Sequence, residues 1–137
     1  DPTEDFSTAN LSGLDLRSAQ FVRANLINTN LTSANLVNAN LEEASLISAN
    51  LSAANLISAN LSSANLISAD MSGANLTSAT LRSANLTGVI LTNAILNHAD
   101  VRRSTMTGAK LDGASLREAA LSHTDLRRAS LAGTDLS

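Results

Sequence analysis

The sequence predicts an all-β solenoid, and three observations lead to that prediction. An apolar residue recurs every five residues, without an insertion, from Phe6 to Leu136. A small residue, usually Ala, stands two places before each of these central residues, and Asn or Asp usually stands between the two. Ser, Thr, Gly, Asn or a charged residue mostly fills the two places that follow, which is the composition of turns.

A five-residue period fits neither a continuous helix nor a straight strand. On an α-helix each repeat would rotate the central residue by a net ~140°, so the leucines would spread around the whole surface. On a strand they would alternate between faces, because the side-chain period is two. The pattern is satisfied when the chain turns a corner once per repeat. The small and central residues then face inward, and the Asn or Asp between them faces outward.

Coils of this kind would stack by strand-like pairing, with each central residue above that of the coil below. Of the 27 central residues 22 are Leu, and all 27 are apolar. We expect the outward Asn and Asp side chains, ~4.8 Å apart along the stack, to form hydrogen-bonded ladders. The repeat covers about residues 4–137 of a single predicted domain, 1–137, and residues 1–5 are expected to lie over the N-terminal edge.

Composition and charge exclude several classes of function. The net charge is -3, so neither a polyanion-binding protein nor a strongly acidic mimic of a polyanion is indicated. The chain has no Cys, which rules out disulfides and thiolate chemistry. No apolar run reaches the length of a membrane span. The chain begins at Asp1, so a cytoplasmic location and an exported one, with its targeting segment removed, both stay open.

The repeat Ala-Asn/Asp-Leu-x-x resembles that of the pentapeptide repeat family, and the likeness extends from Phe6 to Leu136. The resemblance implies a right-handed quadrilateral parallel β-helix with four pentapeptides per coil, and therefore six to seven coils. Such a rod would be on the order of 30 Å long at ~4.8 Å per coil. The resemblance also implies a bacterial source.

With four sides, residues twenty apart would stack in columns on one face. Ile27, Ile47 and Ile67 would then form an outward apolar column, and Val37 and Ile57 would stack on the opposite face. The first column is a candidate partner-binding stripe. The competing interpretation is that β-branched residues simply suit the outer surface of a strand, and the narrow, Ser-flanked row favours it.

A second candidate surface is the irregular stretch from Gly88 to Met106. Ile90 and Ile95 stand where Asn is usual, and Arg102 and Arg103 follow them. With Arg82, these residues would make a mixed apolar and basic recognition patch. Drift of the repeat is the alternative explanation, and the sequence favours it slightly.

No catalytic, cofactor or metal site is predicted. His98 and His123 would fall on adjacent faces in different coils, and no carboxylate cluster completes a ligand set around them. The sequence holds no nucleotide-binding glycine loop or nucleophile elbow. A Leu-filled interior would also leave no pocket for a substrate, so we do not expect an enzyme.

The leading hypothesis is therefore a non-catalytic structural or protein-interaction scaffold with an unidentified protein partner. Nucleic acid is not an expected partner. The alternative, suggested by the resemblance, is a DNA mimic that binds a DNA-processing enzyme such as gyrase, although outward acids are few. At the C-terminal coil we expect either pairing of two copies or protection of the open edge by Asp125, Arg127, Arg128 and Asp135.

Overall fold

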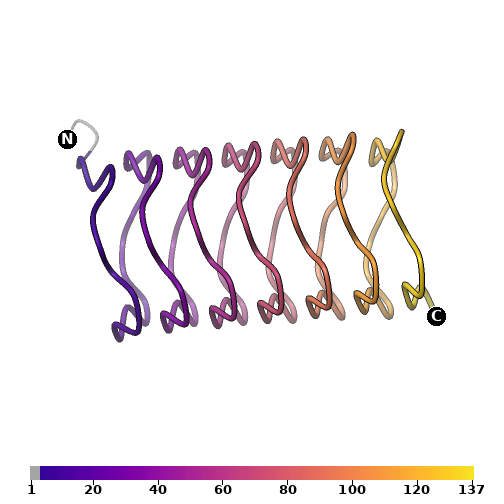
Figure 1. Ribbon diagram of the computed structural model, residues 1–137, viewed down its shortest axis with the longest axis horizontal. Coiled ribbons are helices and arrows are strands. Elements are labelled where there is room, and N and C mark those ends of the chain that lie inside the picture. The colour runs from indigo at the N-terminus through magenta and orange to yellow at the C-terminus, as the bar shows by residue number, and fades with distance from the viewer. Residues whose placement is uncertain (1–3) are drawn as a thin grey trace.

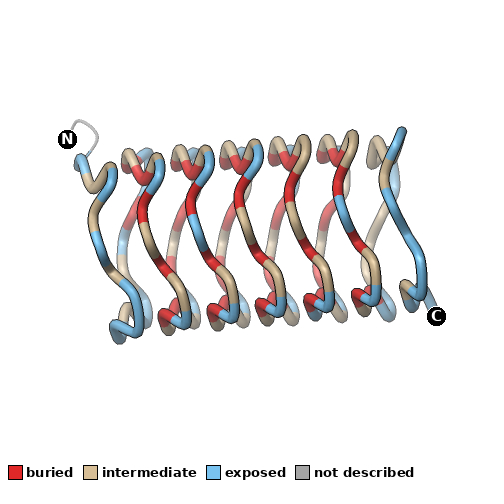
Figure 2. The backbone as a smooth tube through the Cα atoms, in the orientation of Figure 1, coloured by how far each residue is buried: buried red, intermediate tan, exposed pale blue. Residues whose placement is uncertain are grey.

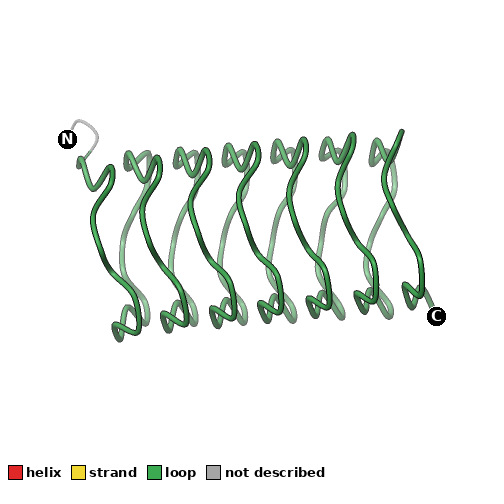
Figure 3. Cartoon of the chain, in the orientation of Figure 1, coloured by secondary structure: helices red, strands yellow, loops and turns green. Residues whose placement is uncertain are grey.

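The computed structural model describes residues 4–137 and shows a four-sided rod in which the chain winds around one axis (Figure 1). Over these residues it forms neither a helix nor a strand of several residues, and Figure 3 draws the whole course as loop and turn. The coils are held by single-residue parallel bridges between residues twenty apart, the first being Asp5 with Asn25 and the last Ser115 with Asp135. Four pentapeptides per coil are therefore confirmed.

Five positions describe each pentapeptide. In Ala34–Asn38 the small position is Ala34, the bridge position Asn35, the centre Leu36, the first turn position Val37 and the second turn position Asn38. We name the four sides by their centres. Face A contains Leu26, face B Leu31, face C Leu36 and face D Leu41, each with every twentieth residue before and after it.

The interior consists of the centres and the small positions, as predicted. From Phe21 to Leu116 every centre is at most 6% exposed, and so is every Ala at a small position from Ala24 to Ala114. Figure 2 shows these buried positions recurring in the same place on each middle coil. At the N-terminal end the ring of Phe6 packs edge-on against Phe21, with the centroids 5.3 Å apart. Residues 1–5 were expected to lie over this N-terminal edge, but residues 1–3 of that segment lie outside the described part of the chain.

Each corner is a tight turn with one residue in the left-handed region. Every second turn position from Thr8 to Gly133 has a positive φ, between 55° and 69°, and only six of these residues are Gly. The N–H of the following small position closes the turn onto the carbonyl of the preceding centre. A positive φ costs a non-Gly residue on the order of 1 kcal/mol, so the hydrogen bonds between coils must hold these corners in place.

In a middle pentapeptide with Asn or Asp at its bridge position, each backbone N–H has its own acceptor. Four of the five donate to backbone carbonyls, one across the turn, one to the preceding coil and two to the following coil. The fifth donates to the side chain of the bridge residue. For Ala34–Asn38 the acceptors are Leu31 O (3.0 Å), Leu14 O (2.9 Å), Asn55 O (2.7 Å), Asn35 Oδ1 (3.3 Å) and Ile57 O (3.0 Å).

The bond from Val37 N–H to Asn35 Oδ1 corrects the expectation of Asn ladders. Every Asn or Asp at a bridge position in residues 4–137 accepts the N–H two residues further on, which satisfies the one backbone donor that the coils leave unpaired. Among the described residues, only Asn60 and Asn40 form a side-chain bond along such a column, at 3.2 Å. The Asn side chain acts within its own turn because that acceptor is needed there.

Candidate interaction surfaces

Only the outward side chains of the two turn positions are left to make contacts with other molecules over most of the rod. The centres and small positions fill the interior, and the bridge residues serve the backbone. Even the polar exceptions are satisfied: the hydroxyls of Thr29, Thr124 and Thr134, at small positions, donate to centre carbonyls of the preceding coil at 2.8 Å. Candidate sites are therefore surfaces made of columns of turn residues.

The predicted column of Ile27, Ile47 and Ile67 lies on face A. The backbone places these residues one above the other, because the residue after each donates its N–H to the carbonyl of the next, as Asn28 does to Ile47. All three are half-buried. Val37 and Ile57 form the corresponding column on face C, which is the opposite face. The structure thus presents the apolar column that the sequence predicted as a narrow row.

The second predicted patch does not come together. Ile90 lies on face B and Ile95 on face C, where its side chain is 39% exposed, whereas Arg102 lies on face D and Arg103 at the corner that leaves face D. The residues are close in sequence, but five residues of chain move each of them to a new side of the rod. The mixed apolar and basic patch of the sequence prediction is wrong in this respect.

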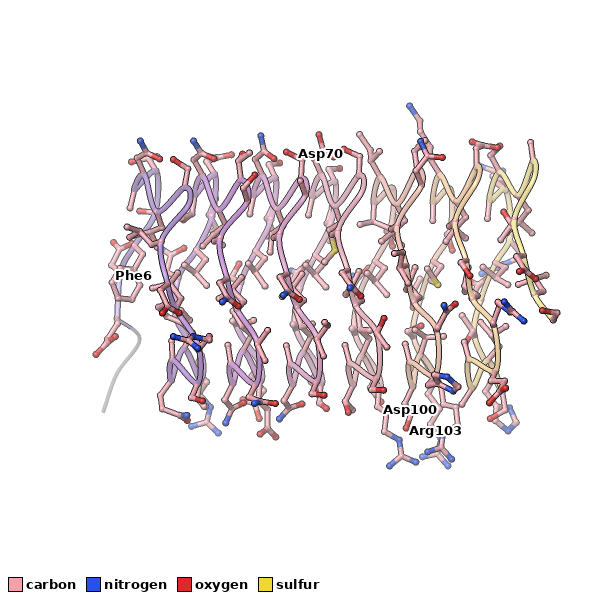
Figure 4. The ribbon with its side chains drawn as sticks, turned by 90° about the horizontal axis from the view of Figure 1, so that it is seen from below. Phe6, Asp70, Asp100 and Arg103 are labelled. Atoms are coloured by element: carbon pink, nitrogen blue, oxygen red, sulfur yellow. The ribbon has the colours of Figure 1, made fainter. Side chains whose placement is uncertain are left out.

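What the structure does bring together is a cluster of arginines on face D. The side chain of Arg102 contacts Asp100 through two bonds, of 2.8 and 2.6 Å, and Arg82 of the preceding coil approaches the same carboxylate at 3.1 Å. The hydrogen bond from the Arg102 side chain lowers the pKa of Asp100, and the charge of Arg82 adds to this effect. Figure 4 shows Asp100 and Arg103 on one side of the rod and Asp70 on the opposite side.

The histidines are separate, as predicted. His98 lies 3.1 Å from Glu118 of the following coil, and His123 lies at the corner that leaves face D. In the described part of the chain no three His, Asp or Glu side chains are grouped as a metal site would require. A depression next to Asp15, Arg17 and Val37 is shallow and open to solvent. Exposed ion pairs on flat faces offer charge and hydrogen bonds, and we see no residue in them placed to activate a nucleophile.

Charged residues at the C-terminal coil pair locally. Arg127 binds Asp125 at 2.6 Å, and its side-chain hydrogen bond holds the pKa of that carboxyl far below its usual range. Asp135 lies 3.7 Å from Arg117. Both the protection of the open edge by these charges and the pairing of two copies there stay predictions.

Comparison with known proteins identifies the family. The family profile described as pentapeptide repeats (8 copies) matches residues 5–42, 34–73, 44–82, 69–108 and 106–137. The chain is a pentapeptide repeat protein. No curated protein matches its sequence. Over residues 4–137 it contains no helix long and apolar enough to cross a membrane.

Several solved structures are similar to this pentapeptide repeat protein. The pentapeptide repeat protein alr5209 of Nostoc PCC 7120 is 31% identical over 64% of this chain and 84% of its own, with a TM-score of 0.54. HetL of Nostoc sp. strain PCC 7120, involved in heterocyst differentiation regulation, is 32% identical over 97% of this chain and 78% of its own, with a TM-score of 0.38. QnrB1, a plasmid-mediated fluoroquinolone resistance protein, is 22% identical over 97% and 77%, with a TM-score of 0.46.

Sequence reasoning missed one surface of this pentapeptide repeat protein. Glu42 and Glu43 lie on face D two and three coils before Arg82 and Arg102, in the same columns as the arginine cluster. Glu43 also binds Arg23 of the preceding coil at 2.7 Å. A tabulation of the sequence in rows of twenty would have found this surface, because charged residues that are 40 to 60 apart then fall in one column.

Proposed function

We propose that the protein is a non-catalytic scaffold whose flat faces bind a protein partner. The observation that carries the proposal is the allocation of groups within the pentapeptide. Its apolar side chains and backbone donors are used inside the rod, so extended rows of turn residues are the surface that is left. Such rows suit a large, flat contact better than the enclosure of a small molecule. In Figure 1 the segments of the chain nearest the viewer run from upper left to lower right, which supports the right-handed coil that the family resemblance implies.

Face A is the surface that best fits a partner. Its column of three isoleucines is continuous over three coils, is half-buried and is bordered by uncharged Ser48 and Ser68. Burial of the exposed part of an apolar row contributes roughly 25 cal/mol per Å², and the surrounding polar groups can remain hydrated at the rim. An apolar centre with a polar rim is the usual arrangement of a protein interface.

A matched pair of variants tests the proposal. Purified wild-type protein is immobilised, used to capture partners from the native host and cross-linked to locate the contact. Substitution of Ile27, Ile47 and Ile67 by Ser should abolish capture, whereas Val37→Ser with Ile57→Ser on face C should preserve it. If both variants capture equally, face A is not the contact surface. Turnover of a small molecule that a single substitution abolishes would contradict the scaffold itself.

The DNA-mimic alternative receives little support from the charges. A mimic needs rows of free outward carboxylates, but all six Asp residues at bridge positions accept a backbone N–H of their own turn, and three of them also bind the Arg two residues further on. Strong inhibition of gyrase supercoiling by the purified protein would favour this alternative over the scaffold.

A further inference from the structure

Face D carries its charges in two separate blocks. An acidic block, Glu42 and Glu43, lies in the second coil, and a basic block, Arg82, Arg102 and Arg103, lies in the fourth and fifth coils. The uncharged residues Ser62 and Ser63 separate the two blocks in the same columns. The side chains of Glu43, Arg82 and Arg102 are all at least 40% exposed.

Contacts within the face do not cancel these charges. Glu43 is bound by Arg23, which leaves the charge of Glu42 in excess in the acidic block. Asp100 is shared by Arg82 and Arg102, so the basic block keeps an excess of two positive charges when Arg103 is included. The backbone N–H of Arg103 donates to Ser122 O, but its guanidinium has no hydrogen-bond or ion-pair partner among residues 4–137. The face therefore has two poles along the rod.

A two-fold rotation brings the opposite poles together. The two-fold axis lies in the plane of face D and is perpendicular to the long axis of the rod. It passes midway between the coil that contains Ser62 and the coil that contains Arg82. The rotation reverses the order of the coils and keeps each column opposite its own counterpart. Glu42 then faces Arg102 of the second copy, and Glu43 faces Arg103 of the second copy. Both contacts occur twice, as a self-complementary interface requires.

We propose that two copies of this chain associate face to face through face D, in antiparallel orientation and in this register. This inference goes beyond the proposed scaffold function, since it assigns face D to a second copy and leaves face A for another partner.

Like charges disfavour the alternative arrangements. In a parallel dimer the basic blocks would lie opposite each other. An antiparallel register displaced by one coil toward the N-terminal end places Arg23 opposite Arg103. Displacement toward the other end places Arg82 opposite its own counterpart. Juxtaposed like charges in an interface cost several kcal/mol, so the charge order selects one register.

The expected interface is small and sensitive to salt. Six coils span ~29 Å, and five residues span at most ~16 Å, so the face offers at most about 460 Å² per copy. The total of about 900 Å² lies below the standard size of a stable interface, so association should need high protein concentration. Exposed charge pairs are screened at a Debye length of about 3 Å in 1 M salt, which should dissociate the dimer.

Charge reversal with a mixing step provides the test, measured by sedimentation equilibrium at low and high salt. Wild-type protein should dimerise at low salt. Glu42→Lys with Glu43→Lys, and separately Arg102→Glu with Arg103→Glu, should each weaken the dimer at least tenfold. An equimolar mixture of these two variants should form a heterodimer, because every facing pair is then again of opposite charge. Circular dichroism establishes that each variant is folded.

The matched control is Arg127→Glu with Arg128→Glu, which makes the same charge change at the same two turn positions on face A and its exit corner. It should dimerise like the wild type. The proposal is overturned if the wild type stays monomeric at low salt, if the mixed variants do not associate, or if only the control variant loses association. That last result would place the contact at the C-terminal coil instead. None of these outcomes tests the capture of a partner through face A, so the dimer proposal can fail without contradicting the scaffold proposal.

Discussion

The coils built from residues 44–79 and those built from residues 80–115 share one interior and differ on the outside. In both, the centres and small positions are at most 1% exposed. In the earlier segment six of the seven bridge positions are Asn or Asp, and Asp70 is the only charged residue. In the later segment two of the eight are Asn or Asp, and six residues are charged. The interior therefore does not constrain the exterior.

Where Ser replaces Asn or Asp at two bridge positions near the C-terminal end, the preceding coil supplies the missing acceptor. Ser115 and Ser130 stand at bridge positions and cannot serve the backbone as Asn does. Asn97 instead accepts the N–H of Arg117 from one coil away, at 3.1 Å, and Asp112 accepts that of Ala132, at 3.0 Å. Each also binds the hydroxyl of the bridge Ser. At these two turns the backbone donor remains paired although the bridge residue has changed. At Thr80 no such substitute exists, and the N–H of Arg82 has no acceptor among the described residues.

The largest effect should come from the shared interior. Leu56→Ala and Leu96→Ala remove fully buried centres of face C, one from each segment. Each should lower the free energy of unfolding by about 3–5 kcal/mol, because the stacked coils cannot collapse into the cavity. Urea unfolding followed by circular dichroism measures both variants. A cost for Leu96→Ala of less than half that for Leu56→Ala would show that the two interiors differ.

A smaller effect should come from the bridge position. Asn50→Ala removes the acceptor of the Ser52 N–H and should destabilise the earlier segment by about 1 kcal/mol. Thr80→Asn supplies an acceptor to the N–H of Arg82, which has none among the described residues, and should stabilise by about 0.5–1 kcal/mol. Thr80→Val, of nearly the same shape, should bring no such gain. A stabilisation by Val equal to that by Asn would assign the effect to packing.

The smallest effect should be the response to acid. The hydrogen bond from Arg102 lowers the pKa of Asp100 below the value of 3.8. The contribution of this carboxylate to stability is therefore complete above about pH 4 and is lost as the pH falls through the lowered pKa. Asp100→Asn keeps the bridge acceptor and removes the charge. Its unfolding midpoint should fall less steeply than that of the wild type between pH 4 and 2, and equal slopes would contradict the role of the ion pair.

Much of the fold follows from the period alone, and particular residues show where that reasoning stops. Leu36 and Ala34 are inward because only an inward pair two residues apart makes a five-residue apolar repeat consistent. The role of Asn35 was misjudged, because the need of its own turn for an acceptor is visible only when each backbone N–H is followed to its partner. The column of Ile27, Ile47 and Ile67 was found once four sides were assumed.

The sequence by itself determined the repeat, the inward residues and the family of this protein, because these depend on neighbours within five residues. A period of five is compatible with any number of sides, so the number four rested on the family resemblance, and the tertiary structure established that residues twenty apart share a face. That arrangement separated Ile90 and Ile95 from Arg102, and it aligned Glu42 and Glu43 with the arginines of face D. The charge pattern of the rod depends on the coil, which brings together residues that the sequence keeps apart.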